Sequence, residues 1–172
     1  MHIRQFIWAA GMAAMVLTTP ASAAPVAALE DSEARALILI PLTLTKIDDL
    51  DFGAVIASSA SGTVTINHGT GVRTFTGGTS GLASEAGNRA YFGGAGSPNQ
   101  QVLVAISPPT ELVSVGGDTI PVTGLTLDGA PMRSIDPDSR TFFVGVGGTL
   151  EIAADQAPGD YNAEFWVTAI YQ

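Results

Sequence analysis

The sequence predicts an all-β protein built as a sandwich, Greek key or jelly roll. Short β-rich runs recur along the chain, separated by breakers such as Gly-Gly, Pro-Pro, Asp-Gly and Pro-Gly. No stretch beyond the first residues has helical periodicity, although residues 82–90 could form a turn or two of helix. At 172 residues the chain has the length of one domain.

The first 23 residues have the pattern of a secretory signal peptide. Residues 1–4 are short and basic, residues 6–17 are apolar, and residues 20–23 supply a small-residue cleavage site. The apolar run is shorter than the roughly 20 residues that cross a bilayer as a helix, so a retained anchor is the minor alternative. We expect export, cleavage after Ala23 and no membrane span afterwards. Residues 24–33 are acidic and poorly alternating, which predicts a flexible segment.

Residues 34–45 alternate with a period of two, which predicts a β-strand. Leu37 and Leu39 make one face partly apolar, and Pro41 indicates an edge or bulged strand because it has no N–H to donate. The other face carries an unbroken apolar row: Ala34, Ala36, Ile38, Ile40, Leu42 and Leu44.

The domain proper is predicted to span residues 46–172. Residues 63–66 and 72–75 flank a glycine-containing connection and predict a hairpin. The other predicted strands are 90–92, 101–107, 111–115, 119–127, 141–146, 149–153 and 161–171. Two stretches rich in small residues, 57–62 and 77–96, are expected to be mobile loops.

Composition excludes several kinds of partner. Lys and Arg number 7 against 16 Asp and Glu, a formal charge of -9, so the chain is unsuited to binding nucleic acid or anionic membranes. The absence of cysteine rules out disulfides and thiolate zinc sites. Lys46 is the only lysine, so sheet edges lack the usual lysine protection and are expected to be paired or covered.

Two short features could suggest catalysis. Residues 51–53 spell the Asp-Phe-Gly triplet of protein kinases, but no phosphate-binding loop accompanies it, and a strand-to-turn corner with Phe52 buried is the simpler interpretation. His68 is the only histidine after residue 23 and falls in the predicted hairpin turn, without a nucleophile elbow elsewhere. We expect His68 to be a surface turn residue.

Aspartates cluster at 48–51 and 136–138 and could offer oxygens to calcium. Neither cluster follows an EF-hand or nonapeptide spacing, so solvated loop carboxylates are the simpler interpretation. A glycosidase carboxylate pair is compatible with the sequence, but aromatic residues make up only 7% of the chain and no aromatic-rich groove is evident. We therefore expect no enzyme activity, cofactor or metal.

The C-terminal strand ends the chain and alternates strictly, with Tyr161, Ala163, Phe165, Val167, Ala169 and Tyr171 on one face. In this it resembles the last strand of chaperone–usher pilus subunits, which carries a penultimate tyrosine and a glycine fourteen places from the end. Tyr171 and Gly159 occupy those two positions.

The front half extends the resemblance. The alternating first strand, followed by residues 49–53 and 62–66, is similar to the opening of spore-coat-U-type pilin domains and of an uncharacterised family of exported pilin-like β-proteins of Gram-negative bacteria. Residues 144–150 and the corner at 158–161 also resemble that uncharacterised family. Together these segments span most of residues 34–172.

The resemblance implies an immunoglobulin-like, pilin-like sandwich with Greek-key connections that lacks one strand and is completed by a neighbour's N-terminal segment. The chain would then be a non-enzymatic structural subunit of a pilus- or fimbria-like surface fibre, assembled by donor-strand exchange. Its partner would be a second copy or a related subunit, with a periplasmic chaperone and an outer-membrane usher as candidate helpers.

Two questions stay open at this level. Residues 34–45 are either the donated strand or the domain's own first strand, and burial of each large side chain there is worth about 1.5–3 kcal/mol in either role. The spore-coat-U-type domains usually carry a disulfide near the first strand, whereas residues 46–50 of this chain contain no cysteine that could form one.

The alternative function is a free-standing exported sandwich that binds carbohydrate or another surface ligand through glycine-rich loops.

Overall fold

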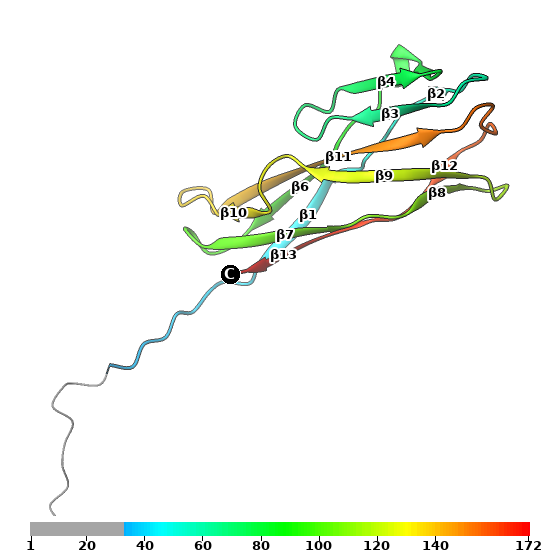
Figure 1. Ribbon diagram of the computed structural model, residues 1–172. Helices are drawn as coiled ribbons and strands as arrows, with labels where there is room; N and C mark the ends of the chain where they lie inside the picture. Colours follow the sequence, from blue (N-terminus) through cyan, green and yellow to red (C-terminus); the bar gives the residue numbers. More distant parts are fainter. Residues whose placement is uncertain (1–32) are drawn as a thin grey trace, which may run out of the picture. The chain divides into compact units, whose positions relative to one another are not determined.

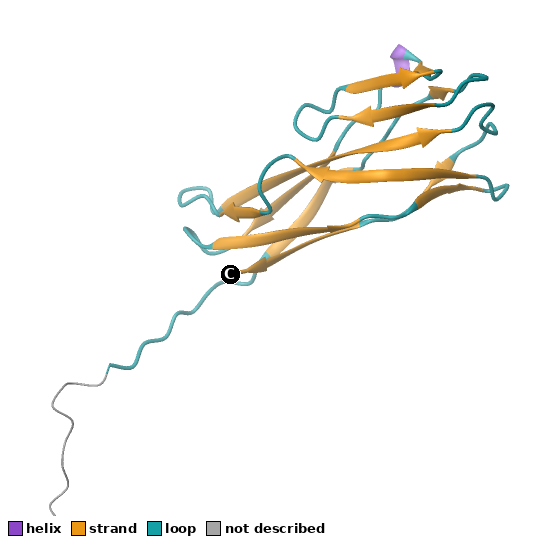
Figure 2. Ribbon diagram, viewed as in Figure 1, coloured by secondary structure: helices purple, strands orange, loops and turns teal. Residues whose placement is uncertain are grey.

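The fold consists of antiparallel β-sheets, as Figures 1 and 2 show. A computed structural model describes residues 33–172. The chain divides into two units, residues 1–36 and 37–172, and the second unit contains every strand of the described part. This confirms the predicted all-β, sandwich-like fold. The predicted signal peptide, 1–23, and residues 24–32 of the predicted flexible segment lie outside the described residues.

The larger sheet is centred on the long strand β11 (Thr141–Ile152). Its order is β1 (Thr43–Asp48), β6 (Ala90–Ala95), β11, β9 (Thr119–Leu127), β8 (Glu111–Ser114) and β12 (Tyr161–Asn162). On one side β11 pairs first with β6 and then with β3 (Gly62–Ile66), which continues to β4 (Arg73–Gly77). On its other side it pairs with β9.

The smaller sheet has the order β10 (Met132–Ser134), β7 (Gln101–Ser107) and β13 (Trp166–Tyr171). A two-stranded ladder joins β2 (Val55–Ile56) to β5 (Ser80–Gly81), and the helical turn η1 (Ala83–Glu85) follows. Residues 108–110, from β7 to β8, and residues 163–165, from β12 to β13, are two of the places where the chain passes between the sheets. The smaller sheet therefore ends before the larger one does.

Two hydrophobic clusters form the core. The first lies where the sheets overlap and joins Val102 and Val104 of β7 to residues of β6 and β11, among them Phe142 and Val144. The second contains Val64, Ile120, Leu150 and Ile152, and is covered in part by Phe52, Val55, Ala57, Phe75 and Tyr161. Because the smaller sheet does not reach the second cluster, short segments and single side chains cover it in place of paired strands.

The first strand is shorter than predicted. The strand expected over 34–45 begins only at Thr43, and residues 33–42 are not in a strand. Thr43 pairs with Ala95, the last residue of β6, so no partner strand extends further. Pro41 also removes one donor at this point.

The break predicted between strands 141–146 and 149–153 is wrong, because β11 runs through both. Gly147 and Gly148 are strand residues rather than turn residues. A Cβ at Gly147 would lie 2.3 Å from the carbonyl oxygen of Ile66, so glycine serves a close backbone approach here.

The mobile loop predicted over 77–96 is also wrong. This stretch contains β5, η1 and β6, and Ala90 is fully buried in the first cluster. The glycines of β6 make room for aromatic rings: a Cβ at Gly94 would lie 2.2 Å from the ring of Phe142. The short strands β2, β5 and β10 were not predicted.

The predicted C-terminal strand is divided into β12 and β13, because residues 163–165 cross between sheets. The predicted faces are confirmed for β13. Phe165, Val167, Ala169 and Tyr171 pack against the first core cluster, whereas Trp166 and Ile170 are exposed. The hairpin predicted at 63–75 is also confirmed, as β3 pairs with β4 in register.

Candidate assembly groove

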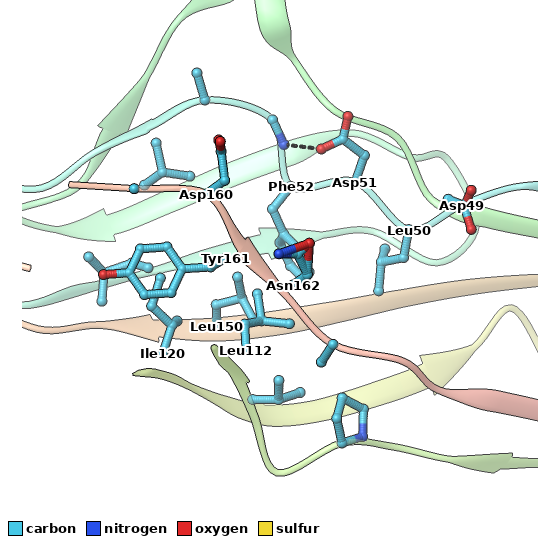
Figure 3. Close-up of a pocket in the computed structure, with 18 of the residues that line it drawn as sticks. Asp49, Leu50, Asp51, Phe52, Leu112, Ile120, Leu150, Asp160, Tyr161 and Asn162 are labelled. Carbon is cyan, nitrogen blue, oxygen red and sulfur yellow. Dashed lines mark hydrogen bonds between the residues drawn. The ribbon is translucent and has the colours of Figure 1, made fainter. Parts of the chain in front are cut away.

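A groove of about 1350 Å³ opens over the second core cluster, and we call it the assembly groove. Its walls are residues 49–57 on one side and 156–166 on the other (Figure 3). Its floor is apolar and comes from three strands of the larger sheet: Leu112 of β8, Ile120, Val122 and Leu125 of β9, and Leu150 and Ile152 of β11.

The first wall, residues 49–57, is held from outside by Arg73 of β4. The Arg73 guanidinium donates to the carbonyl oxygens of Phe52 at 2.8 Å, Ala54 at 3.1 Å and Leu82 at 2.7 Å. The wall turns at Gly53, where φ is +66° and the backbone N–H donates to Asp51 Oδ1 at 2.7 Å. The predicted corner at residues 51–53 is therefore present, with Phe52 half-buried.

The second wall, residues 156–166, is fixed near one end by Tyr161. Its hydroxyl donates to the carbonyl oxygen of Ala157 at 2.6 Å and accepts from Gln156 Nε2 at 3.0 Å. Further along, the ring of Phe165 packs edge-on against Phe92, with centroids 6.3 Å apart. The wall is thus positioned by its side chains at both ends.

Between those anchors the second wall has an open edge. Residues 163–165 belong to no strand, and β13 pairs with β7 along one edge only. An unpaired edge carries free N–H and C=O groups that can receive a further strand. The groove therefore combines an apolar floor, in which Ile120 is 7% exposed and Leu150 and Ile152 are 3% exposed, with a backbone edge open to pairing.

The segment before β1 exposes apolar side chains. Leu37 is 73% exposed, Ile38 92% and Ile40 47%. Its exit point is fixed at Ile40, whose N–H donates to Ser97 Oγ at 2.9 Å and whose carbonyl accepts from the Tyr171 hydroxyl at 2.9 Å. The same hydroxyl accepts from the Ser97 N–H at 2.7 Å. Tyr171 therefore ties the end of β13 to the segment just ahead of β1.

Tyr171→Phe should lower the free energy of unfolding by about 1–3 kcal/mol, since it leaves a part-buried N–H and a carbonyl without partners. Urea unfolding followed by circular dichroism measures this change. An unchanged midpoint would mean that water replaces the hydroxyl without cost. Tyr91→Phe is the control, because Tyr91 stacks on Phe143 through its ring, at 5.6 Å between centroids.

The six residues predicted as one donor face are divided by the structure. Leu42 and Leu44 pack on the chain's own first core cluster. Ala34, Ala36, Ile38 and Ile40 are exposed. Of the C-terminal residues singled out by sequence, Gly159 and Tyr161 line the groove, Phe165 lies where the groove meets the first cluster, and Val167 and Tyr171 pack on that cluster.

The other candidates do not form a site. His68 lies in the β3–β4 turn, as expected, but it is half-buried there and not at the surface. Asp136 accepts hydrogen bonds from the backbone and hydroxyl of Ser139 and from the N–H of Asp138, and these bonds lower the pKa of its carboxyl. Within residues 33–172, no three His, Cys, Asp or Glu side chains lie together as metal ligands.

Sequence reasoning missed the residues that shape the groove. Arg73 gave no signal, because its role depends on segments 19 and 21 positions away. Ile120 and Leu150 were predicted only as strand residues. Trp166 offered a usable signal, since a large apolar residue stood on the face of the last strand assigned to solvent.

The fold and the groove define a class: an all-β, sandwich-like domain with an apolar groove along one side. Residues 42–171 match the family model described as "Domain of unknown function (DUF4402)", and the chain belongs to this family. The match spans β1 to β13. No curated protein and no solved structure matches the chain. None of the helices found within residues 33–172 has the length and apolar character of a membrane span.

Proposed function

We propose that this protein is an exported, non-enzymatic structural subunit that polymerises by strand donation. The segment ahead of β1 of one copy, residues 34–40, would fill the assembly groove of the next copy. The apolar groove with an open strand edge is the observation that carries the proposal. The pilin-like resemblance of residues 34–172 supports the same mechanism.

The exposed segment has the chemistry that the groove requires. With Ala34, Ala36, Ile38 and Ile40 facing inward, small residues are followed by large ones, and the two isoleucines alone would bury apolar surface worth about 3–6 kcal/mol. Main-chain hydrogen bonds to the free edge at residues 163–171 would add to this. In the monomer the segment 34–40 has no strand partner, and the edge at residues 163–171 has none on its free side in the described part of the chain. Pairing of the two would give each its missing partner.

The positions of donor and groove favour a chain of subunits over a closed pair. The donor leaves beside Tyr171, near the C-terminus, whereas β2 and β12 beside the groove lie at the other end of the sandwich (Figure 1). Such a contact joins two different surfaces, so it repeats head to tail and produces an open filament.

Ile38→Asp tests the proposal in the chain of residues 24–172. Ile38 is 92% exposed, so the variant should fold normally but remain monomeric, because a carboxylate would have to enter the apolar groove. The parent chain should form multimers that persist in SDS without boiling. Size-exclusion chromatography with light scattering, followed by unheated SDS gels, distinguishes the two.

Val115→Asp is the matched control, because Val115 is 100% exposed and lies outside the groove. It should assemble like the parent chain. A parent chain that stays monomeric at all concentrations, or an Ile38→Asp variant that assembles equally well, contradicts the proposal. A monomer that binds glycans would support the carbohydrate-binding alternative.

A further inference from the structure

The donated segment is apolar on both faces, and the groove explains only one of them. With Ile38 and Ile40 facing inward, strand alternation turns Leu37, which is exposed in the monomer, and Leu39, which is half-buried, to the outer face. A strand with one solvated face would carry polar residues at these positions. The Leu-Ile-Leu-Ile run at 37–40 therefore calls for a second apolar surface in addition to the floor of the groove.

Such a surface lies on the outer face of β13, which begins at Trp166, the last residue of the groove's second wall. Trp166 is 60% exposed and Ile170 57% exposed, although Phe165, just before β13, and Val167 and Ala169 within it pack on the core. On the paired edge, Trp166 lies opposite Ser107, which is too small to cover an indole. On the other edge β13 has no partner in the described part of the chain. A strand added at that edge would place side chains beside Trp166.

We propose that Leu37 and Leu39 of the donating copy pack on Trp166 and Ile170 of the receiving copy, so that the joint clamps the donated strand from both faces. This inference rests on the proposed function and adds a second contact surface to it. Residues on one face of paired strands have Cβ atoms about 4.5–5.5 Å apart when directly opposite, and diagonal neighbours stay within reach of an indole. If the donated strand shifts by two residues relative to β13, Leu37 and Leu39 exchange places beside Trp166. A leucine therefore contacts Trp166 in either register.

The head-to-tail arrangement fixes the direction of this strand. The donor enters the receiving copy at the β12 end of the groove and runs toward Tyr171, with Ile40 nearest the entrance. It is therefore antiparallel to β13, which runs from Trp166 to Tyr171. In this direction Leu39 and Leu37 lie nearest to Trp166. Arg35 lies further along β13, toward Ile170.

Trp166 reports on this contact directly. The chain of residues 24–172 contains no other tryptophan, since Trp8 lies in the removed segment. The monomeric Ile38→Asp chain serves as the receiver, and a synthetic peptide of residues 33–42 serves as the donor. Isothermal titration calorimetry measures binding, and fluorescence measures the environment of Trp166. The peptide should bind and shift Trp166 emission to shorter wavelength.

Two altered peptides distinguish the faces. The peptide with Leu37→Ser and Leu39→Ser should bind about tenfold more weakly, from two lost cross-strand contacts, and should shift the emission less. The peptide with Ile38→Ser and Ile40→Ser should lose most of its binding. With a Trp166→Thr receiver, the parent peptide and the outer-face peptide, which carries Leu37→Ser and Leu39→Ser, should bind almost equally. This receiver lacks the indole that the two leucines would contact.

The outcomes separate this inference from the proposed function. If the parent peptide binds but Trp166 emission stays unchanged, or the outer-face peptide binds as tightly as the parent, the outer contact is refuted and strand donation stands. If the parent peptide does not bind, strand donation fails and the outer contact fails with it.

Discussion

Phe142→Ala should reduce the free energy of unfolding by about 3–5 kcal/mol, the range for removing a buried phenylalanine. Phe142 is 5% exposed and belongs to the first core cluster. Its ring rests on the backbone of Gly94, which has no side chain that could move into the vacated space. The cavity should therefore persist, and urea unfolding should show a lower midpoint with an unchanged m-value.

Phe143→Ala is the matched control from the next position of the same strand. Phe143 is 49% exposed on the opposite face of β11 and stacks on Tyr91. Its loss should cost less than that of Phe142, about 1–2 kcal/mol, from the stacked pair and the half-buried ring. Similar losses for the two variants would mean that the faces of β11 are assigned wrongly.

Arg73→Ala should lower the free energy of unfolding by about 3 kcal/mol or more and should also weaken donor binding. The guanidinium donates three hydrogen bonds to backbone carbonyls, and a hydrogen bond to a charged group contributes about 1.5–3 kcal/mol. Two of these carbonyls, those of Phe52 and Ala54, belong to the first wall of the assembly groove. The wall should become mobile, and the 33–42 peptide should bind at least about tenfold more weakly.

Thr74→Ala, at the exposed neighbouring position of β4, is the control and should change stability by no more than about 0.5 kcal/mol. Arg73→Lys should recover only part of the loss, because one ammonium cannot reach three separate carbonyls in the guanidinium's planar arrangement. An Arg73→Ala variant that keeps both its stability and its peptide affinity would show that the wall is held by other contacts.

The local pattern of apolar and polar residues was sufficient to predict much of the sandwich. Strict alternation at residues 165–171 predicted which side chains of β13 face the core, because side-chain direction in a strand depends only on position. The 63–75 hairpin was predicted because both strands and their connection are adjacent in the sequence. Glycines misled the prediction at 93–94 and 147–148, where they serve close packing inside strands.

The groove was beyond prediction, because it depends on residues far apart in the chain. It exists because the smaller sheet ends where β7 and β13 cross to the larger one, which leaves Ile120 and Leu150 without a covering strand. The position of Arg73 depends in the same way on β4 lying beside residues 52–54. No periodicity in a single segment contains that information.

The sequence by itself determined the all-β class, the core-facing row of the last strand and the apolar character of the segment ahead of β1, since each follows from composition or from the two-residue period of a strand. The tertiary structure alone decided where that apolar character is used. Leu42 and Leu44 have a partner strand and a core to pack on, whereas Leu37, Ile38 and Ile40 extend beyond the end of β6 and remain exposed. The physical reason is that burial requires a partner surface, and whether one is present depends on how distant strands pair.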